Sequence, residues 1–159
     1  MARATKTTAK LERMDAAGQA LRWLSKTLPQ HTADPELWEV ITDTLDRLDR
    51  DPLDAGQSPR TLLARFGLRL IRALGWGLEL HRCVRCERLC EEGRSARLDP
   101  IRGGLVCRRC GGGPLLLSGP LRKRLVAATE GMDLSSDATE VELALRIVEQ
   151  VLSAHAGVD

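Results

Sequence analysis

Aromatic residues are scarce in this chain of 159 residues, which has three Trp, one Phe and no Tyr. Strands favour aromatic and β-branched side chains, so this scarcity argues against a large β-rich fold. The chain also lacks any apolar run near the roughly 18–20 residues that a transmembrane helix needs. No apolar stretch follows the basic first ten residues, so we expect no secretory signal, no membrane partner and a cytoplasmic protein.

Motifs of catalysis are missing as well. The sequence has no glycine-rich phosphate loop opening a helix, no G-x-S-x-G and no H-E-x-x-H. Its three histidines, His31, His81 and His155, are scattered along the chain. We therefore predict that the protein is not an enzyme and has no small-molecule substrate.

Neither sign of charge dominates overall, since 24 basic and 22 acidic side chains leave a net charge of +2. The distribution is uneven, however: residues 81–124 have a net charge of +7, and residues 125–159 one of −6. Arginine presents a planar fork that suits phosphate oxygens. The basic segment therefore predicts a nucleic-acid-binding surface; a solvated basic face is the alternative. Its eleven basic residues are Arg82, Arg85, Arg88, Arg94, Arg97, Arg102, Arg108, Arg109, Arg122, Lys123 and Arg124.

Four of the five cysteines form two C-x2-C pairs separated by twenty residues, Cys83 with Cys86 and Cys107 with Cys110. Each pair can place two thiolates on one side of a tetrahedral metal ion. The spacing predicts one structural zinc ion, because four thiolates leave no open position for catalysis. Disulfides and a redox site are alternatives. The odd cysteine count and the lack of an export signal weigh against disulfides.

Two further residues near these pairs need an interpretation. Cys90 lies outside the pattern, and we interpret it as a small apolar or surface residue rather than a fifth ligand. His81 precedes the first ligand by two residues, and we expect it to support the site or to face solvent.

Signals for helices dominate the rest of the chain. Predicted helices cover residues 10–27, a segment starting after Asp34, residues 59–73, residues 121–129 and a segment starting after Asp137. Pro29 should end the first helix. Asp34-Pro35 and Ser58-Pro59 are typical of a cap followed by Pro at the first helical position.

Apolar residues spaced by three and four predict the buried face of each helix. The last helix is expected to bury Val141, Leu145, Val148 and Leu152, and the third Leu63, Phe66, Leu70 and Leu74. We expect Trp38 and Trp76 to pack in the core rather than to line a groove for a partner. The first helix is expected to bury Leu11, Met14, Ala17, Leu21, Leu24 and Leu28, and the second Trp38, Ile41, Leu45 and Leu48.

Between the cysteine pairs the pattern changes to two short strands, residues 95–99 and 105–107, joined by a turn. The sequence thus predicts a mainly α fold: a helical bundle with an inserted zinc-ribbon-like module of four cysteines and a short β-hairpin. The expected parts are a basic N-terminal segment (residues 1–10), a helical domain (11–80), the zinc-binding module (81–114), and C-terminal helices (115–159) that pack back on the helical domain.

The order of these parts resembles the C-terminal part of the bacterial recombination and repair family RecO. The resemblance rests on residues 66–76 (FGLRLIRALGW), on residues 79–86 (ELHRCVRC) and on residues 103–110 (GGLVCRRC), and it covers about residues 11–151. Its most specific part is the helix rich in Arg and Leu that ends in Leu74-Gly75-Trp76, just before the first cysteine pair.

This resemblance implies a recombination mediator. Such proteins bind single- and double-stranded DNA, anneal complementary strands, and load the RecA recombinase with RecR and the single-stranded DNA-binding protein. Family members start with an OB-fold, which holds single strands by aromatic stacking and a basic groove. No β-rich segment precedes Leu11, so we expect a fragment or a shortened relative with partial activity.

Two rival interpretations remain open from the sequence. One is a transcription regulator of the DksA type, in which a helical arm and a four-cysteine finger act on RNA polymerase. The breaks at Pro29 and Asp34-Pro35 favour a compact bundle over such an arm. The other rival is a structural zinc-ribbon scaffold whose basic residues serve solubility or a protein partner.

Overall fold

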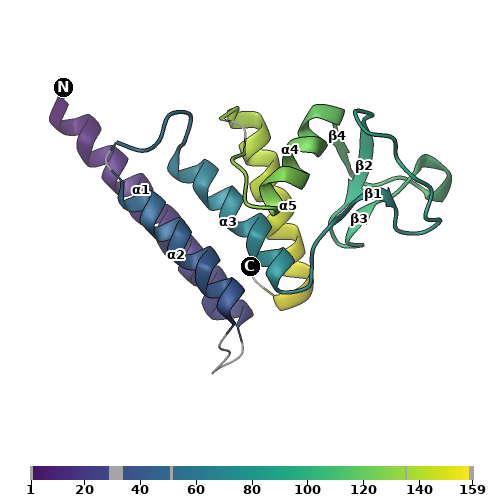
Figure 1. The fold of residues 1–159 in the computed structure, drawn as a ribbon, viewed down its shortest axis with the longest axis horizontal. Coiled ribbons are helices and arrows are strands. Elements are labelled where there is room, and N and C mark those ends of the chain that lie inside the picture. Colours follow the sequence, from purple (N-terminus) through teal and green to yellow (C-terminus); the bar gives the residue numbers. More distant parts are fainter. Residues whose placement is uncertain (1, 29–33, 51, 135, 158–159) are drawn as a thin grey trace.

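The part of the chain that the structure describes forms five α-helices and a small four-stranded sheet (Figure 1). The computed structural model describes residues 2–28, 34–50, 52–134 and 136–157. The mainly α fold with a small β module predicted from the sequence is confirmed. The elements are α1 (Ala2–Thr27), α2 (Pro35–Asp49), α3 (Pro59–Ala73), β1 (Glu79–Cys83), β2 (Ala96–Asp99), β3 (Gly104–Leu105), the 3-10 turn η1 (Arg108–Cys110), β4 (Leu115–Leu117), α4 (Gly119–Thr129) and α5 (Ala138–Ala156).

Helix α3 lies at the centre of the bundle and contacts α1, α2, α4 and α5. It is buried nearly all round, and Phe66, Leu68, Leu70 and Ile71 are at most 1% exposed. This central position explains why its apolar residues do not keep to one stripe, since a surface helix buries one face only. Helix α5 packs along α3 with the four residues predicted for its buried face.

The predicted helix starts are confirmed by their hydrogen bonds. The carboxylate of Asp34 accepts from the backbone N–H of Glu36 at 2.9 Å. The Ser58 hydroxyl accepts from the first turn of α3, and Ser118 does the same for α4. Asp137, after which the last helix was predicted to start, accepts from the N–H of Glu140 at 3.0 Å. Each bond satisfies a backbone donor that has no partner within its helix.

The buried face predicted for α1 is largely wrong. Leu11, Met14 and Leu21 are more than half exposed, whereas Ala16, Ala20 and Trp23 are buried together with Leu24. The small side chains of Ala16 and Ala20 let α1 approach α3, where Trp23 stacks on Phe66 with ring centroids 6.4 Å apart. The helix also starts at Ala2, eight residues earlier than expected, so it includes most of the basic N-terminal segment. Pro29 lies outside the described residues.

Helix α2 also turns a different face to the core than predicted. Leu37, Val40, Thr44 and Leu48 are buried, but Trp38 is 68% exposed, so its assignment to the core is wrong. Trp76 is half-buried and stacks on His155 with ring centroids 5.0 Å apart.

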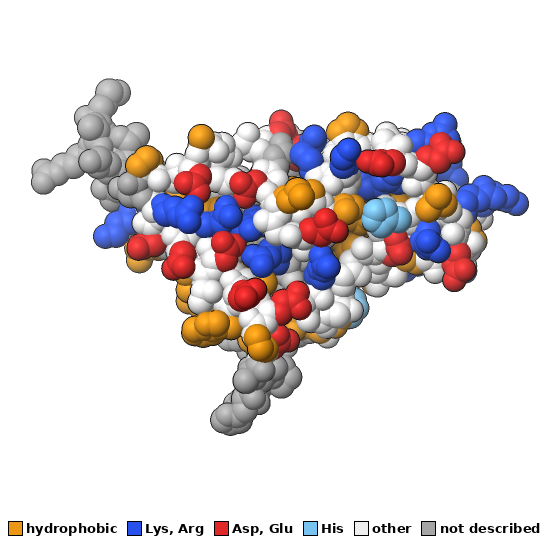
Figure 2. Space-filling model, viewed as in Figure 1, with side chains coloured by type: hydrophobic (Ala, Val, Ile, Leu, Met, Phe, Trp, Pro, Cys, Tyr) orange, Lys and Arg blue, Asp and Glu red, His pale blue; other side chains and the backbone are white. Residues whose placement is uncertain are grey.

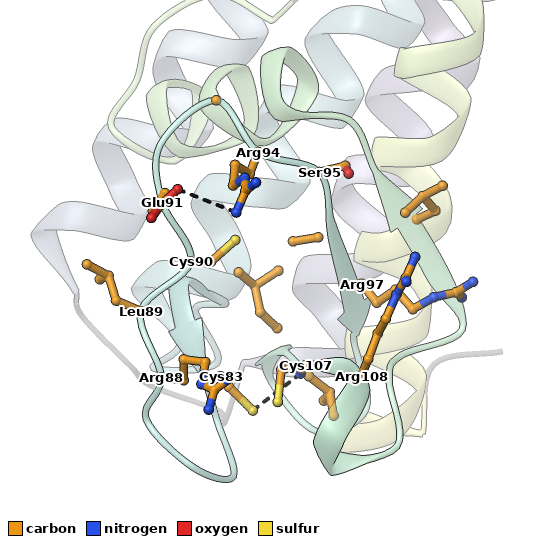
Figure 3. Close-up of a pocket in the computed structure, with 15 residues that line it drawn as sticks. Cys83, Arg88, Leu89, Cys90, Glu91, Arg94, Ser95, Arg97, Cys107 and Arg108 are labelled. Atoms are coloured by element: carbon orange, nitrogen blue, oxygen red, sulfur yellow. Dashed lines mark hydrogen bonds and ion pairs between the residues drawn. The ribbon is translucent and has the colours of Figure 1, made fainter.

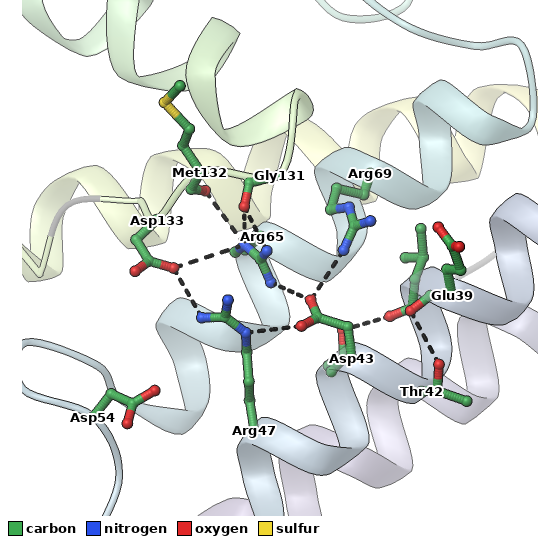
Figure 4. Close-up of polar contacts among 12 residues, drawn as sticks. Glu39, Thr42, Asp43, Arg47, Asp54, Arg65, Arg69, Gly131, Met132 and Asp133 are labelled. Carbon is green, nitrogen blue, oxygen red and sulfur yellow. Dashed lines mark hydrogen bonds and ion pairs between the residues drawn. The ribbon is translucent and has the colours of Figure 1, made fainter.

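A polar network joins α2 to α3 and to the segment after α4 (Figure 4). Its centre is Arg65, which is only 4% exposed and donates to Asp43 and to the carbonyl oxygens of Gly131 and Met132. Asp43 also accepts from Arg47 and Arg69, each at 3.0 Å. Since a buried charge without partners is costly, these contacts are what allow Arg65 to lie inside the bundle.

The sheet has the strand order β1-β3-β2-β4. The predicted hairpin is confirmed as β2 antiparallel to β3. Strands β1 and β4 were not predicted; β1 pairs with β3 in parallel, and β4 pairs with β2. We call residues 79–117 the cysteine module. Figure 1 shows it at the opposite end of the molecule from α1 and α2.

The cysteine module is attached to the bundle through the N-terminal turns of α4. Arg122, 5% exposed, donates from Nη2 to the carbonyl oxygens of Cys90 and Glu91. Gly119 lies so close to Gly93 that a Cβ atom there would come within 1.8 Å of the Gly93 carbonyl oxygen. These contacts fix the 89–93 loop against α4. Among the described residues, no helix is long and apolar enough to cross a membrane.

Candidate metal centre and nucleic-acid interface

The two cysteine pairs come together at one end of the cysteine module. The Sγ atoms of Cys83, Cys86, Cys107 and Cys110 all lie within 4.8 Å of one another. Cys83 ends β1 and Cys107 precedes η1, and the parallel pairing of β1 with β3 brings these two segments side by side. The four residues can hold a metal ion, as the spacing predicted.

One sulfur–sulfur distance within the cluster matches the value expected for a tetrahedral thiolate site. Ligands about 2.3 Å from a zinc ion at tetrahedral angles lie about 3.8 Å apart. The Sγ atoms of Cys86 and Cys107 are 3.7 Å apart. The backbone N–H of Cys107 donates to Sγ of Cys83 at 3.4 Å, a contact that favours a thiolate at that position.

The pKa values of the thiols within the cluster diverge. Burial opposes ionisation of Cys83, but backbone N–H groups of Cys107, Arg85 and Cys86 outweigh it and lower the pKa of the thiol to about 6. The neighbouring Cys107 and Cys86 side chains raise the pKa of Cys110 to about 12. Four thiolates at this spacing repel one another, so the donor set suits a bound divalent cation.

The other two residues singled out near the site are placed as follows. Cys90 is half-buried, and its N–H donates to the His81 carbonyl oxygen at 2.8 Å. It does not belong to the group of four sulfur atoms. His81 is exposed on β1.

The basic residues of the cysteine module differ in whether their side chains have hydrogen-bond or ion-pair partners. Arg85 donates to the Cys110 carbonyl oxygen at 3.3 Å, and Arg97 donates to that of Gly113 at 3.1 Å. Arg102 pairs with Asp99. Within the cysteine module, all of whose residues the structure describes, four exposed arginines have no hydrogen-bond or ion-pair partner for their side chains: Arg82, Arg88, Arg108 and Arg109. Figure 2 shows basic side chains gathered around this end of the molecule, with acidic ones among them.

The three basic residues at the start of α4 are engaged within the molecule. Arg122 is buried in the contact with the 89–93 loop described above. Lys123 pairs with Glu92 at 3.2 Å, and Arg124 pairs with Glu140 of α5. Their place in a nucleic-acid interface stays a prediction, and the exposed arginines of the cysteine module are better placed for that role.

A groove of about 880 Å³ lies beside the cysteine cluster, between the 88–95 segment and the strands β2 and β3. Four arginines line it, Arg88, Arg94, Arg97 and Arg108, and we call it the arginine groove. Figure 3 shows Arg88 on one side of it, Arg97 and Arg108 on the opposite side, and Arg94 at the end near α4.

Sequence reasoning found the four arginines but missed the residues that shape the groove. The apolar side chains are Leu89, Ala96, Leu105, Val106 and Leu116, and Ser95 adds a hydroxyl. Leu89 and Leu116 are more than 60% exposed. Exposed leucines would point to such a groove, but which leucines are exposed depends on strand pairing that the sequence did not predict.

Comparison with known proteins gives a consistent result. The family model for the C-terminal part of recombination protein O matches residues 9–159. The DNA repair protein RecO of Sinorhizobium medicae is 30% identical over 140 residues, and that of Agrobacterium fabrum is 30% identical over 144 residues. Each alignment covers 86% of this chain and 50% of the relative. The RecO of Anaeromyxobacter sp. strain K is 34% identical over 104 residues, 65% of this chain and 38% of the relative. The chain thus spans about half the length of the first two relatives.

Proposed function

Because this chain belongs to the RecO family and matches the C-terminal part of it, we propose that it acts in DNA repair and recombination by binding DNA. The binding surface is the exposed arginine set of the cysteine module. The observation that carries the proposal is that Arg82, Arg88, Arg108 and Arg109 have no acidic partner among the described residues. Such side chains are free to contact phosphate oxygens.

The metal in this proposal is one structural zinc ion held by Cys83, Cys86, Cys107 and Cys110. All four donors are cysteine sulfur atoms, and two of them lie 3.7 Å apart. This donor set supports a closed structural zinc site over an open catalytic one. When bound, zinc would supply folding free energy to the turns that carry the four cysteines. Cys107 and Cys110 flank the single turn, η1, that presents Arg108 and Arg109.

The role is one of binding without chemistry, and the partners follow from the family. By resemblance, they are single- and double-stranded DNA, RecR and the single-stranded DNA-binding protein, and the outcome is strand annealing and RecA loading. The chain spans about half the length of its relatives. We therefore propose these partners and activities for a complete mediator, to which this chain contributes the C-terminal part. The cytoplasm, where such partners act, is the proposed location.

A salt titration tests the proposal. The protein is titrated into a fluorescently labelled oligonucleotide at several salt concentrations between about 50 and 200 mM. Phosphate binding predicts that the logarithm of the association constant falls linearly with the logarithm of the salt concentration. The substitution of Arg108 and Arg109 together by Gln should weaken binding and flatten this slope, while elemental analysis checks that the variant keeps its metal. No binding at low salt would contradict the proposal.

A further inference from the structure

The arginine groove differs from the rest of the basic surface because its charges face one another across a concavity. Arg88 comes from the segment after the first cysteine pair, and Arg108 from the second cysteine turn, on the opposite wall (Figure 3). Arg109 is the next residue in the chain, yet it does not line the groove. Two neighbouring arginines of the same turn therefore face different surroundings.

Positive side chains predominate in the groove. Four arginines line it, against one acid, Glu91, and two cysteines of the cluster, Cys83 and Cys107. Glu91 pairs with Arg94 across 3.5 Å, and both side chains are 73% exposed, so this ion pair is weak. Arg88 and Arg108 have no partner within the described residues. Walls of low dielectric constant concentrate the field of such charges inside the cleft, which then attracts polyanions.

The lining of the groove includes buried apolar side chains but no aromatic rings. Leu105 and Val106 are at most 2% exposed, and none of the four aromatic residues of the chain is among the residues that line it. Stacking of bases on aromatic side chains, the usual means of holding single strands tightly, is therefore not available here. The groove can hold a strand through its phosphates.

We infer that the arginine groove binds the sugar–phosphate backbone of single-stranded DNA in preference to duplex DNA. A volume of about 880 Å³ has room for a short piece of one strand. A duplex holds two strands around one axis, with grooves about 6 and 12 Å wide between them, so it is too broad to enter such a cleft and can meet only the rim. The inference rests on the proposed function and adds to it the site and the preference for one strand.

Two matched double variants test this inference. In the first, Arg88 and Arg108, which line the groove, are both replaced by Gln. In the second, Arg82 and Arg109 are replaced by Gln; they are also exposed and also within two residues of a clustered cysteine in the sequence, but they do not line the groove. Both variants lose two charges. Binding is measured by fluorescence anisotropy with one labelled strand, alone and annealed to its complement, over a range of salt concentrations.

If the groove binds the strand, the Arg88→Gln/Arg108→Gln protein should bind single-stranded DNA roughly tenfold more weakly than the wild type. Its salt slope for the single strand should flatten by about 1.4, the contribution of two phosphate contacts. Its affinity for duplex should fall by a smaller factor, and the outer variant should lose less affinity for the single strand. If the first variant loses its metal, Arg94→Gln replaces it as the groove variant, because Arg94 also lines the groove but lies farther along the chain from the two cysteine pairs.

Equal losses in the two variants, or an equal loss for single strand and duplex, would overturn the inference. In that case the proposed DNA binding would still stand, as a property of the whole basic surface. Failure of the wild type to bind either DNA at low salt would remove the proposed function and the groove with it.

Discussion

Arg65 donates from Nη1 to Oδ2 of Asp43 at 2.7 Å, and this ion pair links the centre of α3 to α2. The two partners differ in exposure: Arg65 is 4% exposed, and the Asp43 side chain is 34% exposed. The ion pair therefore joins a buried guanidinium to a carboxylate that is partly hydrated. Its loss should therefore lower the free energy of unfolding more than the loss of a surface ion pair does.

Substitution of Asp43 by Asn should lower the free energy of unfolding by about 2–3 kcal/mol, because it leaves the buried Arg65 with only the longer ion pair to Asp133, at 3.9 Å. Urea denaturation followed by circular dichroism measures this change. Glu142→Gln is the control, since it breaks a pair with Arg60 in which both side chains are about 60% exposed. That variant should change the free energy by no more than about 1 kcal/mol. Equal effects would show that burial of Arg65 has no energetic weight.

Acid should weaken the bundle through the same carboxylate. Burial acts to raise the pKa of Asp43, but the hydrogen bonds from Arg65 and Arg47 outweigh it and hold the pKa below the usual 3.8. A carboxyl whose pKa is lower in the folded state contributes stability above its unfolded pKa and loses it as the pH falls through the folded pKa. The difference in stability between the wild type and Asp43→Asn should therefore shrink below about pH 4. A difference that stays constant down to pH 2 would contradict this.

Removal of one thiolate should unfold the cysteine module selectively. We expect Cys107→Ser to reduce the bound zinc to well under one ion per chain, and hydrogen exchange to increase in β1 and β3, because metal binding supplies folding free energy there. Cys90→Ser should keep both the metal and the protection, since Cys90 lies outside the cluster. Elemental analysis and exchange mass spectrometry measure the two effects. Full zinc content in Cys107→Ser would mean that another residue completes the site.

Replacement of Glu91 by Gln should strengthen the binding of single-stranded DNA. The change removes the one acid that lines the arginine groove and releases Arg94. A gain of about two- to fivefold corresponds to the weight of one exposed ion pair. Glu92→Gln is the matched control, since it makes the same charge change at the next residue, which does not line the groove. An equal gain in both variants would point to net charge alone.

The contact between Gly119 and Gly93 gives a steric prediction. Gly119→Ala places a methyl group within 1.8 Å of the Gly93 carbonyl oxygen, so the 89–93 loop must move, at a cost of about 1–3 kcal/mol. Gly18→Ala on α1 meets no atom within 4 Å and should stabilise the protein by up to about 1 kcal/mol. Thermal denaturation of the two variants should therefore shift in opposite directions. A stabilised Gly119→Ala protein would show that the loop is free to relax.

Features governed by short-range chemistry could be predicted from the sequence. The caps at Asp34, Ser58 and Asp137 depend on hydrogen bonds that span two or three residues. The metal site follows from spacing within two tight turns and one hairpin. Resemblance to the RecO family added the identity, and the family match bears it out.

Features that depend on distant segments could not be predicted. On α1, the large side chains Leu11 and Met14 form the clearest apolar pattern, but they are exposed, because α3 accepts the small Ala16 and Ala20 instead. The pairing of β1 with β3 joins segments about twenty residues apart and forms a parallel ladder, which no local pattern signals. The arginine groove depends on that pairing, so its walls were beyond sequence reasoning.

The parallel pairing of β1 with β3 also has a consequence for a cleaved chain. Exposed Arg88 and Arg94 lie between the two cysteine pairs, and trypsin cuts after such residues. The halves on either side of a cut would remain joined by the β1–β3 ladder and, with zinc bound, by the four thiolates. A nicked protein should therefore migrate as one particle in gel filtration and as two fragments in a denaturing gel. In the proposed zinc-bound state the metal would join the two fragments, so chelation should loosen the nicked form far more than the intact chain.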